Sequence, residues 1–150
     1  MPYATTCGTI HEPGDRCGTL LGAARLPMRE ESVAVARLLV VNVARVWNVP
    51  SDVLDIAELL ASEIVTNAVV HAKGPRDGTV WVAALRSGER LIVECHDPSR
   101  DVPRLLLDPD PLRENGRGLC LVTNLAYDSG VHLTEEPGKS VWFELVAWPY

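Results

Sequence analysis

The sequence predicts an α/β (α+β) two-layer sandwich, in which a mixed, mostly antiparallel sheet of about five strands carries three helices on one face. Two observations predict this class. Long runs with helical apolar periodicity lie in the first half of the chain, over 29–48 and 51–72. The β-type runs then occur in pairs joined by short turns, which indicates hairpins rather than strict alternation of strands and helices.

The chain begins with a segment that lacks any periodic pattern. Residues 1–17 are rich in glycine and polar residues, so we expect an irregular lead-in followed by one domain over 18–150. "TLLGAARLP", residues 19–27, has the composition of a first strand, and Pro27 stops it.

The two long helices follow directly. The helix over 29–48 is apolar nearly all round, and Pro50 ends it because proline cannot continue a helix. Ser51 is expected to cap the second helix, which runs to about Ala72, with Asp52 in its first turn where the helix dipole favours an acid.

The second half of the chain contains the hairpins. Two β-type runs, 79–85 and 90–96, are separated by "RSGE" and predict the first hairpin. Four prolines then break up the stretch 98–115, which is longer than loops usually are in compact domains and is typical of a functional lid or a disordered segment.

A third helix and a second hairpin complete the chain. "GRGLCLVTNLAY", residues 116–127, returns to a helical composition. The runs 130–136 and 140–148, separated by the turn "PGK", predict the closing hairpin.

Charge and hydropathy argue against two classes of partner. The net charge is −6 and no block of basic residues is present, so nucleic acid is not expected as a direct partner. The longest apolar-rich run is interrupted by Arg37, Asn42 and Arg45 and is too short to span a bilayer, which needs roughly 20 apolar residues. Because the N-terminus also lacks the pattern of a secretory signal, we expect a cytoplasmic protein without a membrane segment.

The cysteines are expected to be reduced thiols in that compartment. Cys95 lies in a strand-like run and Cys120 in a helix-like one, so burial accounts for both. Cys7, His11 and Cys17 are conceivable zinc ligands, but no fourth ligand stands at a suitable spacing.

A row of polar residues lies near the end of the second helix. On an ideal helix of about 100° per residue, Glu63 lies at the border of the apolar face, whereas Asn67 and His71 lie within it. In one interpretation Asn67 bonds a backbone carbonyl and His71 belongs to a polar last turn. In the other, the row lines a ligand pocket, where a carboxylate orients a hydroxyl or water and an amide oxygen coordinates a hard cation such as Mg²⁺.

Two further features have both a structural and a functional interpretation. Asp97 ends a strand before Pro98, as a turn-forming acid does, but it could also accept a hydrogen bond from a ligand's amino group. Gly116 and Gly118 open a helix, where free backbone N–H groups can bind phosphate. The spacing G-x-G alone is weak evidence, since it is neither a P-loop nor a full dinucleotide motif.

The order of these features carries more information than any one of them. The helix motif "SEIVTNAVVHA", a strand ending in an acid, a long loop, "GRGL" opening a helix and "GKSVWFEL" in the last hairpin together resemble the GHKL ATP-binding domain. The chain is most similar to the bacterial anti-sigma regulatory factor type, the serine/threonine kinase-like relatives of histidine kinase ATPase domains. The resemblance covers about residues 18–148 and implies the Bergerat-type ATP-binding fold.

The resemblance implies roles for the polar row on the helix. Glu63 matches the catalytic carboxylate that acts as base toward the attacking hydroxyl or water. Asn67 matches the Mg²⁺ ligand that bridges to the triphosphate of ATP. His71 matches a further position of the same ATP-binding motif.

The remaining motifs imply contacts to the base and to the phosphates. Asp97 matches the acid that recognises the amino group of adenine, and Ser140 stands where the family usually has a threonine near adenine. The segment that closes the lid over the phosphates is matched by Gly116, Arg117, Gly118 and Leu119.

As a whole, the resemblance implies a cytoplasmic regulatory protein that binds Mg–ATP or ADP. It would act as an anti-sigma-factor-type serine/threonine kinase on an antagonist protein, or sequester a sigma factor, or both. The alternatives are a non-catalytic, nucleotide-dependent module that only sequesters its partner, and a degenerate relative that binds no nucleotide. The apolar helix 29–48 could serve the partner interface or a homodimer interface.

Two departures from the family bear on these alternatives. The family's second motif commonly reads D-x-G-x-G, whereas this chain reads "DPSRDVP" from Asp97 onward, which slightly favours the sequestering module. The sequence also shows no phosphoacceptor-histidine helical region of a sensor kinase, so we do not expect a self-contained sensor histidine kinase.

Overall fold

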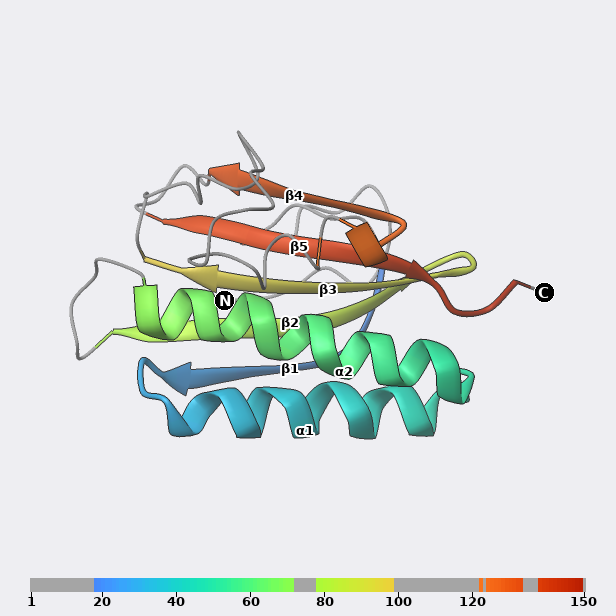
Figure 1. Ribbon diagram of the computed structural model, residues 1–150, viewed down its shortest axis with the longest axis horizontal. Helices are drawn as coiled ribbons and strands as arrows, with labels where there is room; N and C mark the ends of the chain where they lie inside the picture. The colour runs from blue at the N-terminus through green and yellow to red at the C-terminus, as the bar shows by residue number, and fades with distance from the viewer. Residues whose placement is uncertain (1–17, 72–77, 99–121, 123, 134–137, 150) are drawn as a thin grey trace.

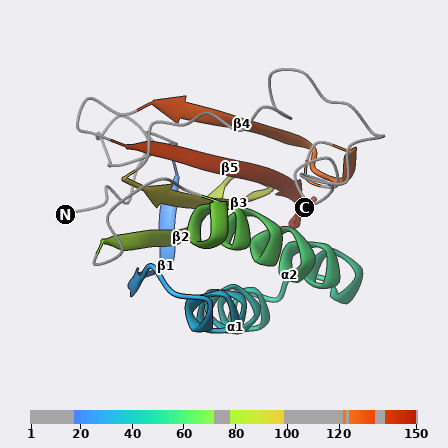
Figure 2. The ribbon, with the colours of Figure 1, turned by 60° about the vertical axis from the view of Figure 1, so that its left-hand side comes forward.

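Two helices lie on one face of a five-stranded sheet in the computed structural model, and two views of the molecule agree on this arrangement (Figure 1, Figure 2). The structure describes residues 18–71, 78–98, 122, 124–133 and 138–149. Within these residues the predicted two-layer architecture is confirmed.

The sheet has the strand order β1-β2-β3-β5-β4, and every neighbouring pair is antiparallel. It is therefore fully antiparallel rather than mixed. The five strands are β1 Thr19–Pro27, β2 Thr79–Ser87, β3 Arg90–Asp97, β4 Asp128–Leu133 and β5 Lys139–Val146.

Both hairpins and the first strand lie close to where the sequence predicts them, although β4 begins at Asp128 and residues 134–136 of the predicted run 130–136 lie outside the described residues. One difference matters for the site. Gly88, with φ +60°, is in the tight turn between β2 and β3. β5 begins at Lys139, which the sequence pattern assigns to a turn. Lys139 pairs with Asp97, so the last residue of β3 and the first residue of β5 lie opposite each other.

The two helices are α1, Glu31–Val46, and α2, Ser51–Thr66. The prediction that Ser51 caps the second helix is wrong. Pro50 is the N-cap, because its ψ of 147° is extended and its carbonyl accepts a bond of 2.8 Å from the N–H of Leu54.

The second helix also ends differently from the prediction. It does not continue regularly to Ala72 but changes at Asn67 into a π-helical turn, η1, Asn67–His71. A π turn has more residues per turn than an α-helix, so an ideal α-helical projection no longer places the side chains that follow Thr66.

The third predicted helix falls largely outside the described residues. Of residues 116–127 the structure describes 122 and 124–127, and only Val122, Asn124 and Leu125 are helical. The segment 99–121, which includes most of the predicted lid, is likewise outside them, as is the lead-in 1–17 with its two cysteines and His11.

The main core lies between the helices and the sheet. α1 packs against β1, and α2 packs against β3 and β5. Gly22 of β1 permits the first of these contacts, because a Cβ there would lie 2.8 Å from Cγ2 of Val43. Leu60 of α2 and Phe143 of β5 are fully buried in this core. Burial of each such side chain contributes about 1.5–3 kcal/mol.

No helix among the described residues is long and apolar enough to cross a membrane.

Candidate functional site

The polar row of the second helix lies on the flank of the helix rather than inside its buried face. The fully buried positions are Ala57, Leu60, Ala61, Ile64, Val65 and Ala68. Glu63 and Asn67 are half-buried beside them. The expectation that Asn67 lies well inside the apolar arc is therefore wrong, since close packing against the sheet centres the buried face on the small residues of the helix.

Glu63 of α2 and Asn67 of η1 have polar side chains of intermediate burial. Neither makes a hydrogen bond or ion pair with the part of the chain that the structure describes. Their half-exposed position lets water solvate them, so they do not carry the 1–3 kcal/mol cost that a fully buried unsatisfied group has, a typical order of magnitude. Asn67 is also the first residue of η1, and π turns in helices occur frequently at functional sites.

His71 is the last residue of η1. Its side chain lies outside the part of the chain that the structure describes. The role that the resemblance implies for it stays a prediction.

A buried ion pair lies at one end of the helix-facing side of the sheet. Nζ of Lys139 lies 3.1 Å from Oδ1 and 3.0 Å from Oδ2 of Asp97. Asp97 is 0% exposed and Lys139 is 1% exposed. Each charge stabilises the other in this buried position. Removal of either one would leave the other desolvated and unpaired, which is strongly destabilising.

Asp97 and Lys139 lie at the ends of two rows of apolar side chains, one on β3 and one on β5. Side chains of a strand alternate between its faces, so Asp97 follows Val93 and Cys95 on the side that packs against the helices. Lys139 precedes Val141 and Phe143 on that same side. The charges are therefore placed at the end of an otherwise apolar surface.

Gly138 fixes the entry of β5 next to this pair. Its φ is +145°, a region that residues with a Cβ rarely adopt. A Cβ at this position would lie 2.6 Å from the backbone oxygen of Asp97 and 2.7 Å from Nε2 of His96. Only glycine allows the chain to pass so close to the end of β3.

The two residues before Asp97 have shifted pKa values. Burial raises the pKa of the Cys95 thiol, and the negative charge of Asp97 adds to this effect, so the thiol stays protonated. This agrees with the expectation that Cys95 is a buried, reduced thiol. Burial lowers the pKa of His96 to about 4, with contributions from the positive charges of Arg25 and Lys139.

Ser140 lies on the opposite face of the sheet from Asp97. It pairs with His96, and the alternation of side chains places both on the side away from the helices. Its Oγ is buried without a hydrogen-bond partner among the described residues. The structure does not bring Ser140 together with Asp97, so the role near adenine stays a prediction. Lys139 does contact Asp97, and the sequence analysis missed it.

The helix row and the buried acid belong to the same region. η1, which begins at Asn67, lies against β3, and both Asp97 and the helices are on the same side of that strand. Gly116, Arg117, Gly118 and Leu119 lie outside the described residues. Among the described residues no group of three or more His, Cys, Asp and Glu side chains could hold a metal ion.

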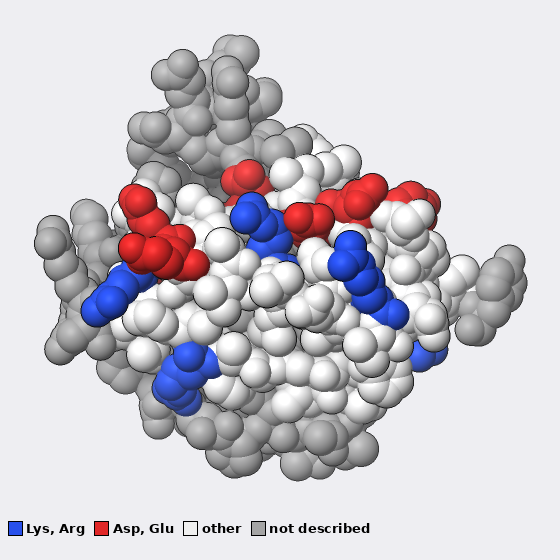
Figure 3. Space-filling view, turned by 90° about the horizontal axis from the view of Figure 1, so that it is seen from below, with Lys and Arg blue, Asp and Glu red and all other residues white. Residues whose placement is uncertain are grey.

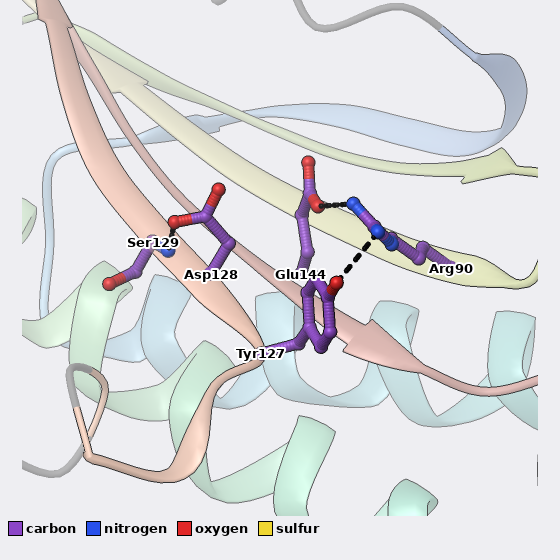
Figure 4. Close-up of polar contacts among 5 residues, drawn as sticks. All are labelled: Arg90, Tyr127, Asp128, Ser129 and Glu144. Atoms are coloured by element: carbon purple, nitrogen blue, oxygen red, sulfur yellow. Dashed lines mark hydrogen bonds and ion pairs between the residues drawn. The ribbon is translucent and has the colours of Figure 1, made fainter.

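A second polar cluster lies at the other end of β3 and has a structural character (Figure 4). Arg90 donates to Oε2 of Glu144 at 3.2 Å and to the hydroxyl of Tyr127 at 2.9 Å. The guanidinium also lies 4.1 Å from the centroid of the Tyr127 ring. Because these groups satisfy one another and link β3, β5 and the residue before β4, we assign them to the stability of the sheet.

Comparisons with known proteins agree with this fold. A family model described as the histidine kinase-like ATPase domain matches residues 26–145. No curated protein matches the chain. A solved structure that resembles it is the crystal structure of the RsbU and RsbW domains of Rv1364c from Mycobacterium tuberculosis, with a TM-score of 0.63 and 14% sequence identity. The likeness covers 84% of this chain and 32% of that one, so the chain spans about a third of its neighbour's length. At this identity the likeness shows the fold.

Proposed function

The chain belongs to the histidine kinase-like ATPase domain family, and on this basis we propose that residues 18–150 form one domain that binds ATP with Mg²⁺. The site would lie where η1 meets the ends of β3 and β5. One observation carries the proposal: Glu63 and Asn67 have no protein partner among the described residues, and η1, which begins at Asn67, lies against the strand that ends in the buried Asp97.

The roles divide between the two ends of the nucleotide. Asp97 would accept a hydrogen bond from the amino group of adenine. Ser140 and His71 are assigned to ATP binding from the family resemblance. The lid over the phosphates would be formed by Gly116, Arg117, Gly118 and Leu119.

Asn67 suits the role of the Mg²⁺ ligand. Its amide oxygen is free of hydrogen bonds to described residues, and Mg²⁺ prefers hard oxygen donors, held by few protein ligands together with substrate phosphates. When bound, Mg²⁺ would neutralise negative charge on the phosphates. The half-exposed position of Asn67 leaves room for the waters that this ion retains.

We propose that the reaction is transfer of the γ-phosphoryl group to a serine or threonine of an antagonist protein. The substrate hydroxyl forms the new O–P bond while the bond from the γ-phosphorus to the β–γ bridging oxygen breaks, and ADP leaves. Glu63 accepts the hydroxyl proton, since its carboxylate is half-exposed and makes no ion pair with the described residues. The protein would be a cytoplasmic regulator, as the family resemblance implies.

Phosphoryl transfer is tested with labelled ATP and a candidate antagonist protein. The wild type should label the antagonist, and Glu63→Gln should lower the rate by about 10²–10⁴, the usual contribution of a positioned base. Glu58→Gln is the matched control, because Glu58 lies on the same helix but its carboxylate is 4.0 Å from Arg37 on the surface. Labelling by Glu63→Gln at the wild-type rate would remove Glu63 from the mechanism.

A second candidate function is nucleotide-dependent sequestration of a sigma factor or its antagonist without turnover. The observation that favours it is the outer side of α1, where Val35, Leu38 and Val46 are 50%, 58% and 75% exposed. On the face seen in Figure 3, uncharged side chains cover much of the surface between scattered acidic and basic ones. Such an apolar surface is suited to a protein partner or to a homodimer.

Calorimetry separates the two candidates. Heat of Mg–ADP binding with no transfer to any antagonist would favour sequestration. Leu38→Glu should then weaken partner binding or self-association in sedimentation experiments, because it places a charge in the apolar surface. Its affinity for Mg–ADP should equal that of the wild type. An unchanged sedimentation profile in the presence of the partner would argue against this use of α1.

A further inference from the structure

Lys139 has more hydrogen-bonding capacity than its surroundings use. Its ammonium has three N–H donors and no acceptor. Both of its contacts, at 3.1 Å and 3.0 Å, are to the carboxylate oxygens of Asp97. It has no other polar partner among the described residues, and at 1% exposure water does not reach it freely. At least one donor of this buried cation therefore has no partner among the described residues.

The backbone sets the place of Lys139, and the ion pair with Asp97 holds its ammonium. Lys139 is the first residue of β5 and lies directly opposite Asp97. Gly138 holds the entry to β5 against the end of β3, with a spacing that excludes a Cβ. The acceptor of Asp97 and the spare donor of Lys139 are thus fixed side by side at one place in the fold.

A fixed acceptor beside a fixed donor matches one chemical pattern in a purine. In adenine the exocyclic amino group, a donor, is flanked by the ring nitrogens N1 and N7, which are acceptors. In guanine the same position carries O6, an acceptor that a carboxylate repels. The pair therefore complements the amino edge of adenine better than that of guanine.

We propose that Lys139 is a specificity-determining residue for the nucleobase, and that its ammonium donates to the ring nitrogen beside the amino group that Asp97 accepts. This inference rests on the proposed function, because it requires that Asp97 faces the adenine. Asp97 alone would recognise only the exocyclic amino group of adenine. Asp97 and Lys139 together would recognise the amino group and the neighbouring ring nitrogen of adenine. Guanine does not present this donor and acceptor in the same order.

The experiment changes the ligand first, so that the fold stays intact. Wild-type protein is titrated with ATP, 1-deaza-ATP, 7-deaza-ATP and GTP in the presence of Mg²⁺. One of the two deaza analogues should bind about 10- to 100-fold more weakly than ATP, because it loses a hydrogen bond from a charged donor, while the other binds as ATP does. GTP should bind more weakly than ATP. Equal affinity for ATP and both deaza analogues overturns the inference, as does GTP binding as tightly as ATP.

A variant then ties the effect to Lys139. In Lys139→Met the affected analogue and ATP should bind with equal affinity, whereas Arg37→Met, which removes an exposed cation, should keep the wild-type difference. A difference that persists in a folded Lys139→Met protein overturns the inference. If that variant does not fold, the wild-type titrations decide.

The outcomes distinguish this inference from the proposed function. No binding of any nucleotide to the wild type would refute the proposed function and the inference with it. Binding of ATP that is indifferent to both ring nitrogens would refute the role of Lys139 alone.

Discussion

The middle and the end of the helix-facing side of the sheet differ in chemistry, although the same strands form both. In the middle, Val93 and Phe143 are opposite each other and are buried under the helices. At the end, Asp97 and Lys139 occupy the equivalent opposed positions and are equally buried. Apolar packing stabilises the first region, whereas a buried ion pair is often no more stable than an apolar pair of similar size.

The difference supports the proposal that the end of the sheet forms a functional site. The same end lies beside η1, where the regular helix changes to a π turn at Asn67. Half-buried polar side chains without described partners, a glycine in a rare conformation and a buried charge pair thus occur in one region. Departures of this kind from local rules concentrate at functional sites.

Loss of one charge at the end should have the largest effect on stability. Lys139→Met leaves Asp97 buried and unpaired, so the free energy of unfolding should fall by about 3–5 kcal/mol, measured by urea denaturation. The double variant Asp97→Leu with Lys139→Met makes the end resemble the middle and should return to within about 1 kcal/mol of the wild type, or exceed it. A double variant no more stable than the single one would contradict this view of the pair.

Gly138→Ala should have the next largest effect. The new Cβ would meet the backbone oxygen of Asp97 at 2.6 Å, and φ of +145° is strained for alanine. We expect a loss at the upper end of about 1–3 kcal/mol. Gly88→Ala is the control, since its φ of +60° carries strain but no atom lies within 4 Å of the new Cβ. Equal losses in the two variants would show that the contact with β3 is unimportant.

Acid should destabilise the protein through His96. Its pKa is about 4 in the folded protein and 6.5 in an ordinary environment, so the unfolded chain binds the proton more readily. The stability is complete above pH 6.5 and falls as the pH drops toward 4. We expect a loss of roughly 1–2 kcal/mol, since His96 is partly exposed and solvent screens its neighbours. In His96→Gln, urea denaturation across this range should show a flatter dependence on pH.

Ser140→Ala should have the smallest effect. The hydroxyl is buried on the opposite face without a partner among the described residues. Its removal relieves an unsatisfied group, so the free energy of unfolding should change by less than about 1 kcal/mol or increase. A clear loss of stability in thermal denaturation would mean that the hydroxyl has a partner.

The sequence predicted the sheet better than the site. Residues 19–27 and the two hairpins could be assigned because β-type composition and short turns are local signals. Asn67 was placed too deep, because an ideal helix ignores the π turn and the packing of small residues against the sheet. Lys139 was missed because "PGK" has the composition of a turn. Val141, Phe143 and Leu145 are two residues apart in the sequence and face the helices, and the same spacing extended to 139 could have found it.

The central claim is that one nucleotide site lies at the end of β3 and β5 beside η1. Titration of ¹⁵N-labelled protein with millimolar Mg–ADP tests it most directly. The account predicts the largest amide shifts at Asn67, Asp97 and Lys139, with little change at Arg90, at the other end of β3. Largest shifts around Arg90 or on the outer side of α1, or no shifts anywhere, would contradict it.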